Sequence, residues 1–120
     1  MMGTSFIATH ESLAQDEYEQ MLIASTVDDL VCTNTVTNVL GNWLRPTLLR
    51  AGIDPDELLF KPKVDFGDEK TREANLKRWR DIWSAGHGVG SVTDIEPVAA
   101  IVDRLHAEYR IAAAKPSCFA

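Results

Sequence analysis

The feature that most constrains the fold is a single strand-like segment at the very beginning of the chain. Residues 4–9 are partly β-branched and follow Gly3, which is typical of a β-strand or its end. A strand cannot satisfy its backbone hydrogen bonds without a neighbouring strand. The rest of the chain offers few candidates for that neighbour. We therefore expect a strand whose partner is missing from these 120 residues.

Helical patterns dominate the remaining sequence. A capping box followed by apolar residues at helical spacing predicts a helix over 13–25. Residues 26–67 mix short extended and helical patterns with Asn, Gly and Pro, and are interpreted as an excursion. Two further amphipathic helices are predicted over 69–85 and 96–113. Such a succession is typical of an α/β protein rather than of a helical bundle, which would not normally begin with a strand.

Composition and charge exclude several functional classes. The chain is 45% hydrophobic and 25% charged, as ordinary globular proteins are, and it contains no apolar run long enough to span a membrane. A net charge of −6 has the wrong sign for binding a phosphate backbone, so no nucleic-acid partner is expected. The two cysteines, Cys32 and Cys118, are too few for a secreted disulfide scaffold, and the N-terminus lacks a signal-peptide pattern. A cytoplasmic protein with reduced thiols is predicted.

Two glycine-containing segments are candidate ligand-binding sites. Gly3 followed by Thr4 would let backbone N–H groups and a hydroxyl approach an anion closely, although such pairs also occur in ordinary turns. The run from Gly86 to Ser91 does not fit a dinucleotide fingerprint, because it follows a helix and its third glycine is not at the required spacing. Its glycines are interpreted as a sharp turn or a close approach to a flat group. His87 in this loop is either a donor to a ligand or a surface residue.

No catalytic or metal-binding constellation is predicted. No Ser/His/Asp set or carboxylate pair has a supporting sequence context, and the sequence holds no Cys/His cluster at metal-ligand spacing. The three histidines, His10, His87 and His106, are scattered along the chain. We therefore assign neither a catalytic residue nor a metal ligand.

The ordered segments resemble the nitronate monooxygenase family, formerly called 2-nitropropane dioxygenases. Residues 2–9, followed by Glu11-Ser12 and Tyr18, resemble its last barrel strand and the helix that follows. Asn42-Trp43-Leu44-Arg45-Pro46 resembles the excursion after that helix. Residues 83–90, with Ile95 and the helix to Tyr109, resemble its C-terminal stretch. The similarity covers residues 2 to 114, and it is carried by the order and spacing of the motifs.

The resemblance implies an FMN-dependent oxidoreductase. The family's flavoproteins bind FMN non-covalently and oxidise alkyl nitronates with O2 through a flavin semiquinone. The implied fold is α/β: residues 1–120 would form the C-terminal portion of a (β/α)8 TIM barrel, mostly helical with one N-terminal strand. Because a complete barrel needs about 250 residues, this chain would be a fragment, inactive alone, whose partner is the missing N-terminal part of the barrel. The family's catalytic histidine would lie in that part.

The resemblance also implies cofactor-binding residues. The family's phosphate-binding Gly-Thr corresponds to Gly3 and Thr4, which would donate to the FMN phosphate, with Met2 adjacent. Gly86, His87 and Gly88 would be a second cofactor-binding segment. The family usually has Gly-Gln there, so His87 replaces a glutamine and departs from the pattern.

Two alternatives remain open. An FMN-dependent NAD(P)H:quinone or enoyl reductase of the same barrel type would share this C-terminal part. A small non-enzymatic helical interaction module would instead use Leu76, Trp79, Trp83 and the apolar stripe over 98–112 as a core of its own.

Overall fold

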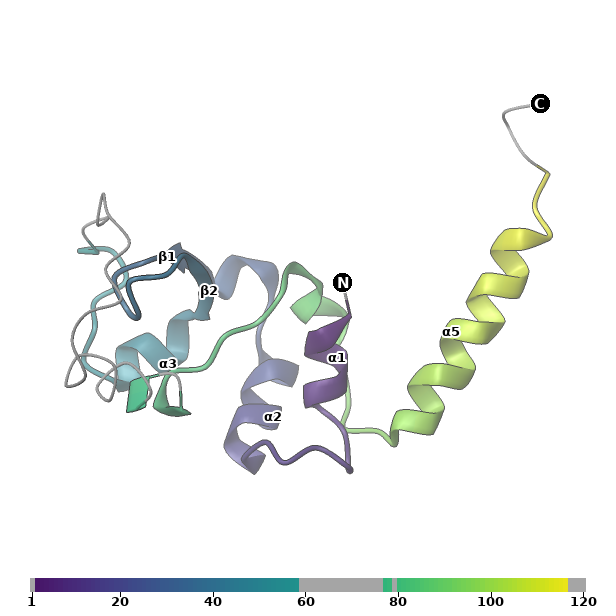
Figure 1. Cartoon of the computed structure of the whole chain (residues 1–120), viewed down its shortest axis with the longest axis horizontal. Coiled ribbons are helices and arrows are strands. Elements are labelled where there is room, and N and C mark those ends of the chain that lie inside the picture. The colour runs from purple at the N-terminus through teal and green to yellow at the C-terminus, as the bar shows by residue number, and fades with distance from the viewer. Residues whose placement is uncertain (1, 59–76, 79, 117–120) are drawn as a thin grey trace.

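The computed structural model describes residues 2–58, 77–78 and 80–116, and shows a mixed α/β structure (Figure 1). Its four described α-helices are α1 (Gly3–Ile7), α2 (Asp16–Ala24), α3 (Arg45–Arg50) and α5 (Val98–Ala113). A two-stranded sheet contains β1 (Leu30–Thr33) and β2 (Gly41–Leu44). Two 3₁₀ helices, η1 (Val27–Asp29) and η2 (His87–Ser91), complete the described elements.

The N-terminal segment is a helix, so the predicted strand over 4–9 is wrong. The Ser5 amide donates to the Met2 carbonyl at 3.1 Å at the start of α1, and the Thr9 hydroxyl donates to the Phe6 carbonyl at 3.0 Å near its end. Thr9 alone adopts a strand-like pairing, in an isolated parallel bridge with Glu96. The prediction depended on β-propensity, which reflects packing on a sheet face more than an intrinsic backbone preference. Among the described residues, the segment pairs with another only through the Thr9–Glu96 bridge, and so does not form a strand of the sheet.

The sheet lies within the region predicted as an excursion, and its geometry overturns the predicted fold class. β1 and β2 are antiparallel, with Leu30 opposite Leu44 and Thr33 opposite Gly41. A TIM barrel is built from parallel strands joined by helices. The described residues contain no such strand set, so the chain is not the C-terminal portion of a TIM barrel in this structure.

The second helix begins later than predicted because the Ser12 hydroxyl accepts the Ala14 amide at 3.0 Å and closes a local turn. The helix predicted over 13–25 therefore occurs as α2, from Asp16 to Ala24. The helix predicted over 96–113 occurs as α5, which begins after Pro97.

The helix predicted over 69–85 is only partly described. Residues 69–76 and 79 lie outside the described part of the chain, while 77–78 and 80–81 are helical. Beyond them the chain is extended: the Trp83 carbonyl accepts the Leu44 amide at 2.9 Å, and the Ala85 amide donates to the Asn42 carbonyl at 3.3 Å. The predicted end at residue 85 is therefore wrong, because residues 83–85 pair with β2.

Two hydrophobic clusters form the core, one on each side of β2. Adjacent residues of a strand point to opposite faces, and Leu44 belongs to one cluster while Trp43 belongs to the other. Leu44 packs with a set of buried residues from the helices and the C-terminal half: Ala8, Leu22, Trp83, Ala85, Val89 and Val92. Trp43 packs with Val36, Leu48 and Ile82. Trp83 and Ala85, which are hydrogen-bonded to β2, thus belong to the Leu44 cluster.

The last helix, α5, projects away from the rest of the molecule (Figure 1). Among its residues only Ile101 is buried, whereas Val102 is 51% and Tyr109 71% exposed. The predicted apolar stripe over 98–112 thus does not form a core of its own, and Leu76 and Trp79 lie outside the described residues. The projection explains a radius of gyration of 17.6 Å, compared with about 14 Å for a compact chain of this length. No described helix combines the length and apolarity needed to cross a bilayer.

Candidate functional site

Two segments far apart in the sequence line one pocket. Gly3, Thr4 and Ile7 of α1 form one wall, and the segment that leads into η2 forms the other with Ser84, Ala85 and Gly86. The pocket has a volume of about 290 Å³. Both segments contain residues that the sequence analysis assigned to cofactor binding, and the fold brings them together.

A direct hydrogen bond joins the two walls. The Gly86 amide donates to the Thr4 hydroxyl oxygen at 2.8 Å. A Cβ atom built on Gly86 would lie 3.2 Å from the same oxygen, closer than an ordinary contact, so a glycine suits this position. A Cβ on Gly3 would meet nothing within 4 Å, which leaves the backbone of that residue open to its surroundings.

The lining offers hydrogen-bond donors but no charge. None of the six lining residues has an ionisable side chain. The Thr4 hydroxyl accepts the Gly86 amide and keeps its own proton as a donor. The amides of Gly3 and Thr4 lie in the first turn of α1, where a helix provides no acceptor of its own. The lining is therefore neutral, and the proton of the Thr4 hydroxyl is available for a ligand.

The structure separates the six predicted cofactor-binding residues into two groups. Gly3, Thr4 and Gly86 line the pocket. Met2 precedes α1, while His87 and Gly88 lie in η2, and all three are exposed and outside the lining. Ser84 and Ala85 also line the pocket but were not predicted, because the helical pattern over 69–85 placed them at the end of a helix rather than in an extended segment.

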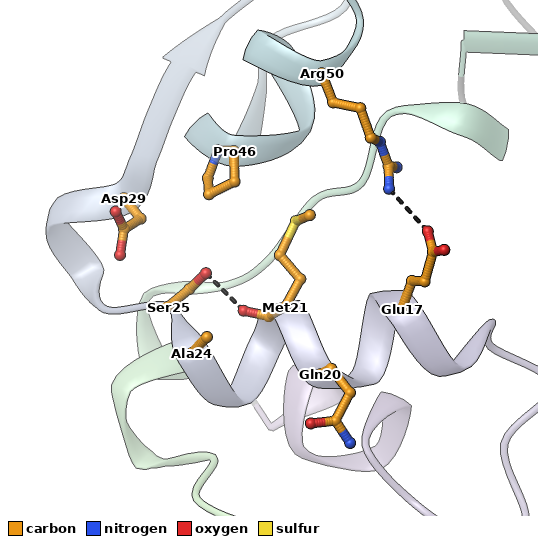
Figure 2. A pocket seen from close by; sticks show the side chains of 8 residues that line it. All are labelled: Glu17, Gln20, Met21, Ala24, Ser25, Asp29, Pro46 and Arg50. Carbon is orange, nitrogen blue, oxygen red and sulfur yellow. Dashed lines mark hydrogen bonds and ion pairs between the residues drawn. The ribbon is translucent and has the colours of Figure 1, made fainter.

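A second pocket of about 500 Å³ lies between α2 and α3 (Figure 2). Arg50 Nη1 forms an ion pair with Glu17 Oε2 at 3.2 Å, and the Arg50 guanidinium carbon lies 4.0 Å from the centre of the Trp83 ring. Asp29 accepts the Thr26 amide at 2.8 Å. The charged groups of this pocket are thus engaged within the chain, and none of the predicted site residues lines it.

Tyr18 of α2 contacts the segment that forms one wall of the first pocket. Its hydroxyl donates to the Ser84 carbonyl at 2.5 Å, and its ring stacks on Trp83 with centroids 4.9 Å apart. Burial raises the pKa of the Tyr18 phenol. The phenol is therefore neutral at pH 7 and acts as a donor.

Histidine and carboxylate groups do not gather around the first pocket. His10, His87 and His106 are all exposed and belong to three different parts of the chain. Within the described residues, no group of three or more His, Cys, Asp or Glu side chains is arranged to hold a metal ion. Comparison of the chain with protein-family models, curated proteins and solved structures finds no match.

Proposed function

We propose that this chain binds the phosphate end of FMN and serves in a cytoplasmic nitronate monooxygenase-like oxidoreductase that oxidises alkyl nitronates with O2. One observation carries the proposal: Gly3 and Thr4 share a pocket with Gly86, and the Thr4 hydroxyl is hydrogen-bonded to the Gly86 amide. The resemblance assigns cofactor binding to both segments on sequence alone. Their meeting in space supports a common ligand.

The pocket suits a phosphate group. The Thr4 hydroxyl can donate to a phosphate oxygen, and the lining lacks a carboxylate that would repel an anion. Bound FMN would supply the redox chemistry, while this chain would hold and orient the phosphate. We assign no catalytic residue to the described part of the chain, and we expect no nitronate oxidation by this chain with added FMN alone.

A titration with FMN and riboflavin tests the binding step. We expect FMN to shift the backbone amide resonances of Gly3, Thr4 and Gly86 in ¹H–¹⁵N spectra, and riboflavin, which lacks the phosphate, to shift them far less. The variant Gly86→Ala should weaken the FMN response, because its Cβ would approach the Thr4 oxygen at 3.2 Å. Gly90→Ala is the matched control, because a Cβ there meets nothing within 4 Å. Equal responses to FMN and riboflavin, or shifts confined to other residues, would contradict the proposal.

An activity measurement tests the reaction class. The assembly that contains this chain, isolated under native conditions from its source cells, should consume O2 with ethyl nitronate. Oxidation of NADH by a quinone without nitronate oxidation would instead favour an FMN-dependent NAD(P)H:quinone reductase. Neither activity in an assembly that contains FMN would contradict both reactions.

A further inference from the structure

The extended segment 83–86 is fixed at each of its residues by contacts from other elements. The Trp83 amide donates to the Thr47 hydroxyl oxygen at 3.2 Å, and the Trp83 carbonyl accepts the Leu44 amide at 2.9 Å. The Ala85 amide donates to the Asn42 carbonyl at 3.3 Å. These three bonds come from β2 and α3, and they hold the side of the segment that faces the sheet.

Tyr18 holds the same segment from α2. Its hydroxyl reaches the Ser84 carbonyl, the residue between Trp83 and Ala85, and its ring lies nearly parallel to the Trp83 ring at an interplanar angle of 16°. Arg50 also contacts the Trp83 ring, at 4.0 Å from its centre. A rigid aromatic contact and a short hydrogen bond therefore fix two consecutive residues of the pocket wall.

From this geometry we infer that Tyr18 is a positioning residue for the pocket formed by Gly3, Thr4 and Gly86. Tyr18 is absent from the pocket lining, so it would act through Ser84. By fixing the Ser84 carbonyl it orients the peptide planes that follow, and so sets the Gly86 amide on the Thr4 hydroxyl at 2.8 Å. That bond orients the Thr4 proton toward a ligand. The consequence for affinity rests on the proposed function, namely that the ligand is FMN.

The test compares Tyr18→Phe with Tyr109→Phe in the full chain. The first variant keeps the ring stack on Trp83 and removes only the hydroxyl. The second removes a hydroxyl from a side chain that is 71% exposed, and serves as the matched control. Loss of one hydrogen bond corresponds to roughly a three- to tenfold change in an equilibrium.

Amide hydrogen exchange gives the first readout, and it does not depend on FMN. We expect Tyr18→Phe to speed exchange at Ala85 and Gly86 by roughly three- to tenfold, with little change at the buried Leu22 of α2. The control should leave all three amides unchanged. Equal acceleration of the three amides would show a general loss of stability, and no acceleration would show that the hydroxyl does not fix the segment. Either result would overturn the inference.

The dissociation constant for FMN gives the second readout. Tyr18→Phe should raise it roughly three- to tenfold, while Tyr109→Phe should not change it. Unchanged FMN affinity in Tyr18→Phe, in a chain that binds FMN, would overturn the positioning role. Failure of the wild-type chain to bind FMN would count against the proposed function instead, and the exchange measurement would still decide the role of Tyr18.

Discussion

Thr47 shows how much of this structure depends on a single buried hydroxyl. Its side chain is fully buried, it accepts the Trp83 amide at 3.2 Å, and it donates to the Asp81 carbonyl at 3.4 Å. Thr47 thus joins α3 to the segment that forms one wall of the pocket. Neither contact could be anticipated from the sequence, because both partners lie more than 30 positions away.

We predict that Thr47→Val destabilises the chain by about 2 kcal/mol, because it leaves the buried Trp83 amide without a partner. Thr47→Ser keeps the hydroxyl and loses one buried methyl group, which costs about 1 kcal/mol. The free energy of unfolding from urea titrations followed by tryptophan fluorescence compares the two. A valine variant as stable as the serine variant would mean that the hydroxyl contributes little.

The predictability of the site can also be judged residue by residue. Gly3 and Thr4 are predicted from the local chemistry of a glycine and a hydroxyl, Gly86 from the family resemblance, and all three line one pocket. Ser84 is not predicted, because the helical pattern over 69–85 includes it, and its contact to Tyr18 is made by a backbone carbonyl that any residue would supply. Local chemistry is readable in a sequence, whereas backbone contacts between distant segments are not.

At the scale of elements, α5 is held by its first turns alone. The Glu11 carboxylate accepts the Val98 amide at 3.0 and 3.2 Å through its two oxygens, which caps the helix from another part of the chain. Arg104 forms two hydrogen bonds with Glu96, at 2.6 and 2.8 Å, and this pair lowers the pKa of the Glu96 carboxyl. Ile101 provides the buried apolar contact.

Truncating two isoleucines of α5 should therefore reduce stability by very different amounts. Ile101→Ala removes a fully buried side chain and should cost about 2–4 kcal/mol of the docking of α5. Ile111→Ala removes a side chain that is 63% exposed and should change stability by less than about 0.5 kcal/mol. Hydrogen exchange across α5 measures the difference. Similar protection in both variants would show that Ile101 does not anchor the helix.

The elements themselves were predicted unevenly, for identifiable reasons. The helical spacing over 96–113 is long and regular, and α5 lies within that range. The five residues of α1 are too few for periodicity to decide, so β-propensity suggested a strand where a helix forms. The extended pattern over Leu30–Thr33 corresponds to β1, but β2 and its pairing with β1 were not predicted, because β2 is only four residues long. Short elements depend on tertiary contacts that a sequence pattern does not contain.

Across the whole molecule, the hydrogen bond between Tyr18 and Ser84 joins the N-terminal half of the chain to the C-terminal half, because the two residues are 66 positions apart. Burial raises the pKa of the folded-state Tyr18 phenol above its ordinary value of 10.0. The unfolded chain therefore loses this proton at lower pH than the folded chain does. It follows that the contribution of neutral Tyr18 to stability is complete below about pH 10 and is lost as the pH rises through the folded-state pKa.

This linkage predicts a difference between variants rather than an absolute curve, because the deprotonation of lysines above pH 10 makes a chain of net charge −6 more negative in every variant. Between pH 9 and 11.5, the free energy of unfolding should fall more steeply in wild type than in Tyr18→Phe. Tyr109→Phe should follow the wild-type curve, because that side chain is 71% exposed. Urea titrations at each pH provide the measurement. Parallel curves for wild type and Tyr18→Phe would mean that Tyr18 ionises equally in the folded and the unfolded chain. The neutral phenol and its bond to Ser84 would then make no pH-dependent contribution to stability.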